Sequence, residues 1–239
     1  MLFILLFTVS MTFGQSQMYI WKNNVIVDTQ TITNDLKISF NTSSGFTCGS
    51  STVNYAGKTY HTVQIGTQCW LKENLDVGNK INGSLDQSNN GTIEKYCYDD
   101  ILSNCTTYGG LYQWDEAMQY ITDSSAQGIC PLGWHLPTKT EIQTLMSAVN
   151  NNGNALKSVG QGTSSGQGTN TSGFSALLGG IRHITGVFGL MNTNVFFHSS
   201  TAIDGGTYDS AIQLFSTDSN ITLEPAHRIN GFPIRCLKN

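Results

Sequence analysis

The chain has 239 residues, which is enough for one substantial core, and only 12% of them are charged, against about a quarter in typical domains. Its formal net charge of −4 gives no electrostatic attraction to nucleic acids or anionic membranes, so neither is expected as a partner. Gly, Ser, Thr and Asn are abundant, a composition typical of a loop-rich extracellular β protein.

The first 14 residues predict a signal peptide. Residues 2–7 are almost wholly apolar, and the small residues Thr12 and Gly14 stand before Gln15, where we expect cleavage. No basic residue precedes the run, and a buried strand is the alternative interpretation. The run is too short to span a bilayer, and no second apolar run of membrane length follows, so we expect an extracellular or cell-surface protein without a transmembrane segment in its mature chain.

Residues 15–47 predict a small β arm followed by a joint. Two apolar runs flank Asn23-Asn24, a pair that tolerates a tight turn, and residues 36–40 alternate as a third strand. Such a unit has little core of its own, so we expect it to dock by strand pairing, either on its own domain or on a neighbouring subunit. The apolar residues to be covered in this assembly arm are Tyr19, Trp21, Ile26, Ile38 and Phe40.

Residues 48–239 predict the main domain. Residues 111–121 carry apolar side chains at helical spacing, and a second helix follows Pro137, where Thr138 and Glu141 form a capping-box pattern. Short strands are predicted from alternating or apolar runs at residues 61–65, 174–178, 195–200, 211–215 and 232–237. Two helices with many short strands indicate an α+β fold.

The chain contains an even number of cysteines, with no C-x-x-C pair and no His or Asp beside them at metal-ligand spacing. This argues against zinc, iron-sulfur or thioredoxin-like chemistry. In an exported chain such a set indicates disulfides, and fifteen connectivities are open. The residues are Cys48, Cys69, Cys97, Cys105, Cys130 and Cys236.

Residues 86–91 begin like a calcium-binding loop, with oxygen-bearing side chains at alternate positions and a glycine at the sixth. The twelfth position is Cys97, so the bidentate Glu of such loops is missing. Calcium at Asp86 and Asn90, or at Asp99 and Asp100, is therefore the less favoured interpretation beside a solvated polar turn. We expect no other cofactor.

No nucleophile, catalytic base or cofactor-binding loop is recognisable. The histidines never fall at i, i+4, and neither a G-x-S-x-G motif nor a dinucleotide fingerprint occurs. Trp70, Trp114 and Trp134 lie in strongly patterned segments, where burial explains them. An aromatic platform for sugars would need one of them, or Tyr208 and Phe197, to face solvent.

Several motifs, read in order, carry a family likeness. They are TVQIGTQCWLKENL at 62–75, YCYD at 96–99 followed by Cys105, YGGLYQW at 108–114, GICPLGWHLPT at 128–138, GFSALLGG at 173–180, SST at 199–201 and GFPIRC at 231–236. Together they resemble the Fibrobacter succinogenes major paralogous domain, over roughly residues 48–239. The arm also resembles the short prelude found ahead of this domain in exported proteins of Bacteroidota.

The resemblance implies a secreted or surface-displayed domain related to C-type-lectin-like and formylglycine-generating-enzyme-like folds, without implying an activity. His198 stands where relatives commonly have an aromatic residue, usually Trp, before the SST motif. If that aromatic belongs to a ligand surface in relatives, this chain has lost it. The candidate ligand-binding residues in this chain are Tyr208, Phe197 and His198. Together with nesting and proximity, the resemblance favours the pairs Cys48–Cys69, Cys97–Cys105 and Cys130–Cys236.

We therefore predict a non-enzymatic, disulfide-closed domain of C-type-lectin-like character, preceded by the β arm. Its expected function is that of an interaction or structural subunit that assembles with other cell-surface proteins or with copies of itself. One alternative is a glycan-binding, lectin-like module. The other is an enzyme derived from the formylglycine-generating scaffold, which needs at least one unpaired cysteine.

Overall fold

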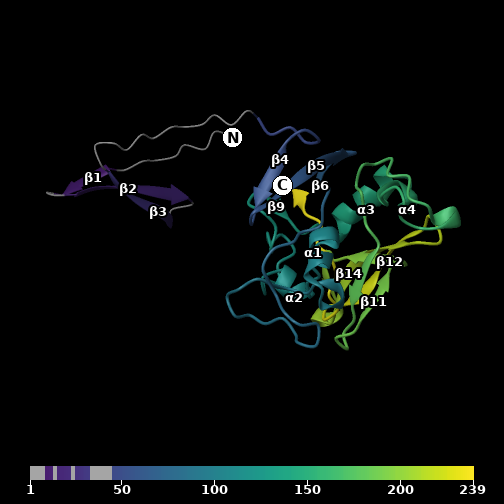
Figure 1. The fold of residues 1–239 in the computed structure, drawn as a ribbon. Coiled ribbons are helices and arrows are strands. Elements are labelled where there is room, and N and C mark those ends of the chain that lie inside the picture. Colours follow the sequence, from purple (N-terminus) through teal and green to yellow (C-terminus); the bar gives the residue numbers. More distant parts are fainter. Residues whose placement is uncertain (1–8, 13–14, 23–24, 33–44) are drawn as a thin grey trace. The chain divides into compact units, whose positions relative to one another are not determined.

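The computed structural model describes residues 9–12, 15–22, 25–32 and 45–239, and the chain divides into two compact units, Met1–Gly45 and Phe46–Asn239 (Figure 1). In the first unit, three strands form an antiparallel sheet in the order β1 (Val9–Thr12), β2 (Gln15–Lys22) and β3 (Val25–Ile32).

The β2–β3 pair is the hairpin that the sequence predicts, since Lys22 pairs with Val25 across the Asn23-Asn24 position. The predicted third strand at residues 36–40 lies outside the described residues. Strand β1 falls within the predicted signal peptide, and cleavage before Gln15 stays a prediction.

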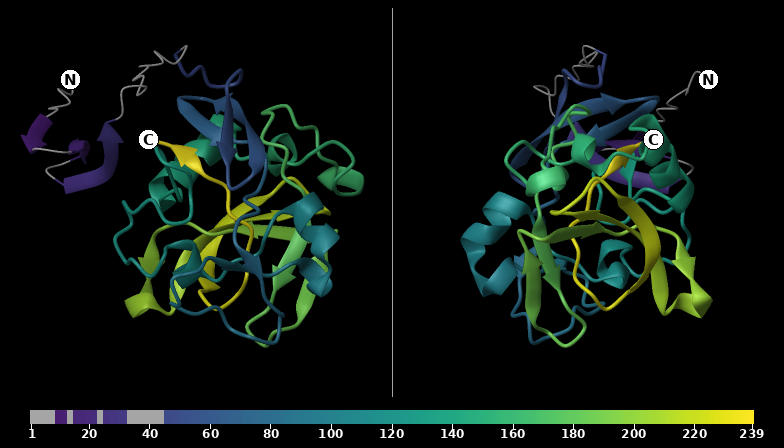
Figure 2. Two further views of the ribbon diagram at one scale, coloured as in Figure 1. Left: turned by 60° about the vertical axis from the view of Figure 1, so that its left-hand side comes forward. Right: turned by 90° about the vertical axis from the view of Figure 1, so that its right-hand side faces the viewer.

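The second unit is built around a five-stranded antiparallel sheet in the order β4-β5-β6-β16-β9. Its C-terminal strand β16 pairs with β6 and β9, so the end of the chain joins two segments from earlier in the sequence. In Figure 2, β16 is the yellow arrow at the C label, beside the blue strands. The strands are β4 (Thr52–Tyr55), β5 (Lys58–Ile65), β6 (Gln68–Leu71), β9 (Trp134–His135) and β16 (Leu237–Lys238). The tight β5–β6 turn requires a left-handed residue, which Gly66 supplies at φ 57°.

A second antiparallel sheet is centred on the long strand β14 (Tyr208–Phe215), which pairs with β12, β13 and β15. Strands β10 and β11 form a hairpin, and β7 and β8 form a short parallel pair. The bounds are β7 (Asn79–Lys80), β8 (Glu94–Lys95), β10 (Gly179–Arg182), β11 (Phe188–Met191), β12 (Asn194–Phe197), β13 (Ala202–Ile203) and β15 (Ile221–His227).

The described residues form four short α-helices and three 3-10 turns rather than the two helices predicted. The α-helices are α1 (Leu102–Tyr108), α2 (Trp114–Ala117), α3 (Lys139–Ala148) and α4 (Gly153–Leu156), and the 3-10 turns are η1 (Tyr98–Asp100), η2 (Ser164–Gly166) and η3 (Asp204–Gly206). No helix in these residues is long and apolar enough to cross a membrane.

Helix α3 begins at the predicted capping box, in which the Thr138 and Glu141 side chains each accept the other residue's backbone N–H. The helix predicted over 111–121 shrinks to α2. Leu111 and Tyr112 form β-bridges instead, and Ile121 is half exposed, so the helical spacing of the apolar residues does not extend into one long helix.

Two large hydrophobic clusters and a small third one around Phe232 fill the domain. One large cluster surrounds Trp114 and the Cys130–Cys236 disulfide, and the other packs α3 against β6, β12 and β14 around Trp70 and Phe174. Trp70, Trp114 and Trp134 are all buried, as predicted. The disulfides join Cys48 to Cys69, Cys97 to Cys105 and Cys130 to Cys236, which is the predicted pairing. The fold is thus mixed α+β with few helices, antiparallel sheets and three disulfides.

Candidate functional site

The predicted ligand surface at Tyr208, Phe197 and His198 does not form. Tyr208, the first residue of β14, is 36% exposed, and its ring lies 5.4 Å from that of His227. Phe197 is only 3% exposed and packs edge-on against Phe174 in the core. His198 is 1% exposed. The prediction was wrong for Phe197 and His198, because the end of β12 turns both side chains into the interior.

His198 takes part in a buried hydrogen-bonded pair. Its Nδ1 lies 3.0 Å from Oδ2 of Asp209 and its Nε2 lies 3.0 Å from the Tyr112 carbonyl oxygen. Its ring is tilted against that of Phe232, with the centroids 4.5 Å apart. The Tyr112 carbonyl can only accept, so Nε2 donates to it. Both ring nitrogens of His198 are thus engaged, and the pair fills part of the interior.

The polar residues predicted as calcium ligands are engaged by protein groups. Asp86 accepts hydrogen bonds from Nη2 of Arg182 at 3.0 Å and from Nε2 of Gln113 at 2.8 Å. Asn90 donates to the Glu94 carboxylate at 2.9 Å. These contacts give the 86–91 segment the character of a hydrogen-bonded turn.

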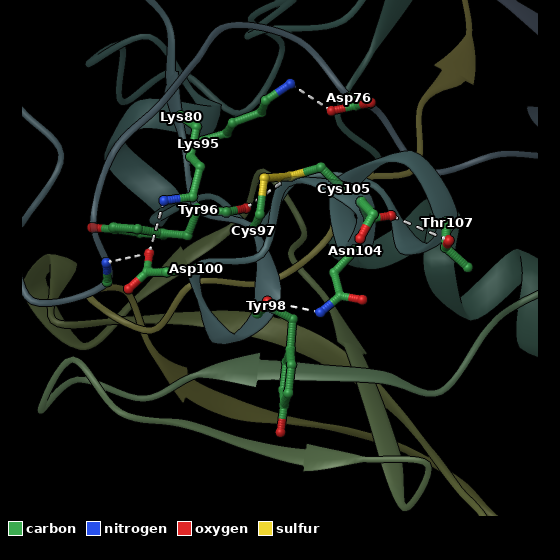
Figure 3. Close-up of a disulfide and its surroundings, with 12 residues drawn as sticks. Asp76, Lys80, Lys95, Tyr96, Cys97, Tyr98, Asp100, Asn104, Cys105 and Thr107 are labelled. Atoms are coloured by element: carbon green, nitrogen blue, oxygen red, sulfur yellow. Dashed lines mark hydrogen bonds and ion pairs between the residues drawn. A yellow bond between two sulfur atoms is a disulfide. The ribbon is translucent and has the colours of Figure 1, made fainter.

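Asp100 is engaged in the same way beside the Cys97–Cys105 disulfide (Figure 3). Its carboxylate accepts from Nζ of Lys80 at 3.2 Å and from the Gly83 backbone N–H at 2.9 Å. Asp99 lies next to it in η1. Over the described ranges, no three His, Cys, Asp or Glu side chains gather in a way that could hold a metal ion. Calcium binding stays a prediction.

The arm residues are only partly placed. Tyr19 and Trp21 lie on β2 and Ile26 lies on β3, whereas Ile38 and Phe40 fall outside the described residues.

A polar cavity of about 320 Å³, which we call the Arg235 pocket, opens where four distant segments meet. Besides these four segments, which are the residues after β6, the end of α1, the stretch after α4 and the residue two before β16, the start of β5 also contributes to the walls. They include Lys58, Lys72, Asn74, Tyr108, Ser158 and Arg235. A second hollow of about 490 Å³ beside α3 has no charged side chain in its lining.

Arg235 is the fixed element of this pocket. It is 2% exposed and lies 4.3 Å from the ring of Phe174. Its Nε and Nη2 donate to Oδ1 of Asn74 at 3.0 and 2.7 Å, and its Nη1 donates to the carbonyls of Leu71 and Phe174 at 3.2 and 2.5 Å. Burial lowers the pKa of Arg235 to about 9, although the nearby Glu73 charge acts in the opposite direction. The guanidinium is still a cation at neutral pH.

The acceptors around Arg235 are all neutral. Within residues 45–239 no carboxylate lies within 4 Å of it, whereas the buried Arg182 and Arg228 have Asp86 and Asp115 at 3.0 and 2.7 Å. Neutral acceptors compensate a buried charge less well than a carboxylate does.

Lys72 in the pocket wall also forms no ion pair in this part of the chain, and the carboxylate of Glu73 is held by the backbone N–H and Nδ1 of His61. The Arg235 pocket therefore has an excess of positive charge, which suits an anionic group.

The sequence motifs did not identify this pocket. Its lining residues are scattered from Lys58 to Arg235, and none has a recognisable spacing. One signal was available, since Arg235 is a charged residue inside the apolar run 232–237 and directly precedes a disulfide cysteine.

Three disulfides, antiparallel sheets and a few short helices define a disulfide-closed α+β domain with a polar, cationic pocket. A sequence model of the Fibrobacter succinogenes major domain matches residues 63–238, which is most of the second unit. The chain therefore belongs to this family, as its motifs predict. Neither a curated protein nor a solved structure matches the chain.

Proposed function

We propose that this protein is an exported, non-enzymatic interaction subunit of C-type-lectin-like character, which assembles with other cell-surface proteins or with copies of itself through its β arm. The observation that carries the proposal is the ribbon of β2 and β3, two eight-residue strands that belong to a unit separate from the disulfide domain.

A two-stranded ribbon is marginally stable alone, and its unpaired edges are templates for another strand. In the full chain, β1 covers one edge of β2. Strand β2 begins at Gln15, the expected first residue of the mature protein, so removal of residues 1–14 would take β1 away. Among the described residues, the mature arm would then leave an unpaired edge on each strand, which favours strand addition with a neighbouring chain.

The disulfides of the second unit support the proposal of an exported protein rather than a thiol-dependent enzyme. All six cysteines are joined in disulfides, and such bonds persist in oxidising compartments. The alternative derived from the formylglycine-generating scaffold needs an unpaired cysteine, so it is not proposed.

The test is to delete residues 15–41 from the mature protein and to measure its mass by light scattering in native extracts and after purification. We expect a folded, oxidised domain that no longer assembles. A matched pair of point variants, Thr29→Pro and Thr29→Val within β3, should separate strand pairing from a change in polarity, since proline cannot donate to a ladder. A truncated protein that fails to fold, or assembles as before, would contradict the proposal.

A second candidate function, glycan binding, is favoured by the Arg235 pocket, where hydroxyl, amide and cationic groups surround one small cavity. A glycan array probed with and without added calcium tests it, and also tests the calcium prediction for Asp86, Asn90, Asp99 and Asp100. Binding to no glycan in either condition would remove this candidate.

A further inference from the structure

We propose that the Arg235 pocket binds a single sugar unit that carries a carboxylate, such as a uronic acid. This inference rests on the second candidate function and names the chemistry of its ligand. Three features of the pocket carry it: an uncompensated buried cation, free hydroxyl groups in the walls, and a volume suited to one sugar ring.

The first feature is the orientation of Asn74. Its Nδ2 donates to the Tyr108 carbonyl at 2.8 Å, and this contact fixes Oδ1 toward the guanidinium of Arg235. A neutral amide thus occupies the place beside the cation that a carboxylate takes at Arg182 and Arg228. Four hydrogen bonds hold Arg235 in one orientation, so a ligand carboxylate entering the cavity meets a preorganised positive charge.

Lys72 provides a second positive charge in the wall, and no acidic partner neutralises it within residues 45–239. The lining carboxylate, Glu73, already accepts two hydrogen bonds from His61. A carboxylate-bearing ligand would therefore interact with two cations that form no ion pair within residues 45–239, whereas a neutral sugar would gain only hydrogen bonds.

The second feature is a set of hydroxyl groups without partners in the described part of the chain. The side chains of Thr106, Tyr108 and Ser158 line the cavity, and none of their oxygens forms a hydrogen bond within residues 45–239. Such groups both donate and accept, which matches the hydroxyls of a sugar ring.

The third feature is size. A volume of about 320 Å³ lies at the lower end of the range for small-molecule sites, roughly 300–1,000 Å³, and suits one sugar unit rather than an extended oligosaccharide.

The experiment uses the mature protein and titrates D-glucuronate and D-glucose by isothermal calorimetry. We expect saturable binding of glucuronate that is at least about tenfold tighter than that of glucose, the factor of one charge-assisted contact. A uronic-acid oligosaccharide in a third titration distinguishes the end of a glycan from a free sugar acid as the source.

The chosen variant is Lys72→Glu, because replacement of the buried Arg235 would alter the fold together with the pocket. It should weaken glucuronate binding at least about tenfold. The matched control is Lys139→Glu, the same charge change at an exposed residue at the start of α3, and it should bind as the parent does.

Two results would overturn the inference. If glucose and glucuronate bind equally and both are lost in Lys72→Glu, the pocket binds sugars without reading charge, and the glycan-binding function stands alone. If neither sugar binds, or if Lys72→Glu binds glucuronate like the parent, this pocket does not recognise a sugar carboxylate. Binding elsewhere on a glycan array would then keep the broader function separate from this inference.

Discussion

The Arg235 pocket and the His198–Asp209 pair solve the same physical problem in different ways. Both place a nitrogen-rich side chain against an aromatic ring, Arg235 on Phe174 and His198 on Phe232. His198 has its own carboxylate, and both side chains of that pair are completely buried. Arg235 has only neutral acceptors and lines a cavity. A buried nitrogen-rich side chain that is paired with a carboxylate of the protein is structural. A buried cation that has only neutral acceptors and lines a cavity can take its counter-charge from a ligand.

The largest expected effect on stability is that of losing the disulfide between Cys130 and Cys236, the residue after Arg235. Replacing Cys130 and Cys236 together by Ala opens a covalent link between residues 106 apart and should lower the free energy of unfolding by about 4–5 kcal/mol. The same double replacement at Cys97 and Cys105, which are only 8 residues apart, should cost about 2–3 kcal/mol. Urea unfolding measures both, and equal losses would contradict the loop-length argument.

The next effect tests whether the His198–Asp209 pair is structural. Asp209→Ala leaves the buried Nδ1 of His198 without its carboxylate and should destabilise the domain by about 3–5 kcal/mol. Asp209→Asn keeps an acceptor of similar shape and should cost less. Thermal and urea unfolding measure the two losses. A loss of unfolding free energy below about 1 kcal/mol for Asp209→Ala would show that the pair does not stabilise this part of the core.

The disulfide frame and the α+β class could be predicted from the sequence. The disulfide pairing rested on nesting and proximity of the cysteines together with the family motifs, which were needed for Cys130 and Cys236 because they are 106 residues apart. The start of α3 rested on a local signal, the spacing of Thr138 and Glu141. The prediction of a helix over residues 111–121 was wrong because Leu111 pairs with Tyr96 and Tyr112 pairs with Phe232. Helical spacing does not reveal these partners.

The candidate site was much less predictable. The Arg235 pocket depends on segments brought together from residue 58 to residue 235, and on the absence of a carboxylate there among the described residues, which only the packed structure shows. His198 illustrates the same limit. Its sequence context indicated a ligand surface, whereas the contacts with Asp209 and Tyr112 bury it. Sequence pattern identifies a special position more readily than it identifies the direction in which the side chain points.

An intermediate case is the partly buried ion pair of His135 and Glu141, in which Nε2 of His135 lies 3.1 Å from Oε2 of Glu141. Burial alone would raise the pKa of Glu141, but hydrogen bonds from His135 and Thr138 outweigh it and lower that pKa to about 2. The hydrogen bond with Glu141 raises the pKa of His135 above 6.5 despite its burial.

The directions of these two pKa shifts define a pH window in which the pair stabilises the fold. The stabilisation from Glu141 is present above pH 4.5 and is lost as the pH falls toward about 2, and that from His135 is present below pH 6.5 and is lost as the pH rises through its raised pKa. The pair should contribute about 1–2 kcal/mol between these limits, after allowance for its partial exposure. Unfolding of the parent and of His135→Gln at about pH 5.5 and about pH 8.5 measures it. A difference between the two proteins that does not shrink at the higher pH would contradict the assignment.

The smallest expected effect on stability is that of Lys72→Glu, and this variant should distinguish the Arg235 pocket most clearly from the His198–Asp209 pair. Lys72 forms no ion pair within residues 45–239, so Lys72→Glu removes no stabilising contact there and brings a negative charge to the wall beside the uncompensated Arg235. We expect the free energy of unfolding to change by less than about 0.5 kcal/mol, since partly exposed charges contribute little. A loss above about 1 kcal/mol in urea unfolding would contradict this, because it would mean that Lys72 already supports the fold. An unchanged stability together with lost glucuronate binding would assign Lys72 to ligand recognition, in contrast to Asp209, whose removal should affect the fold.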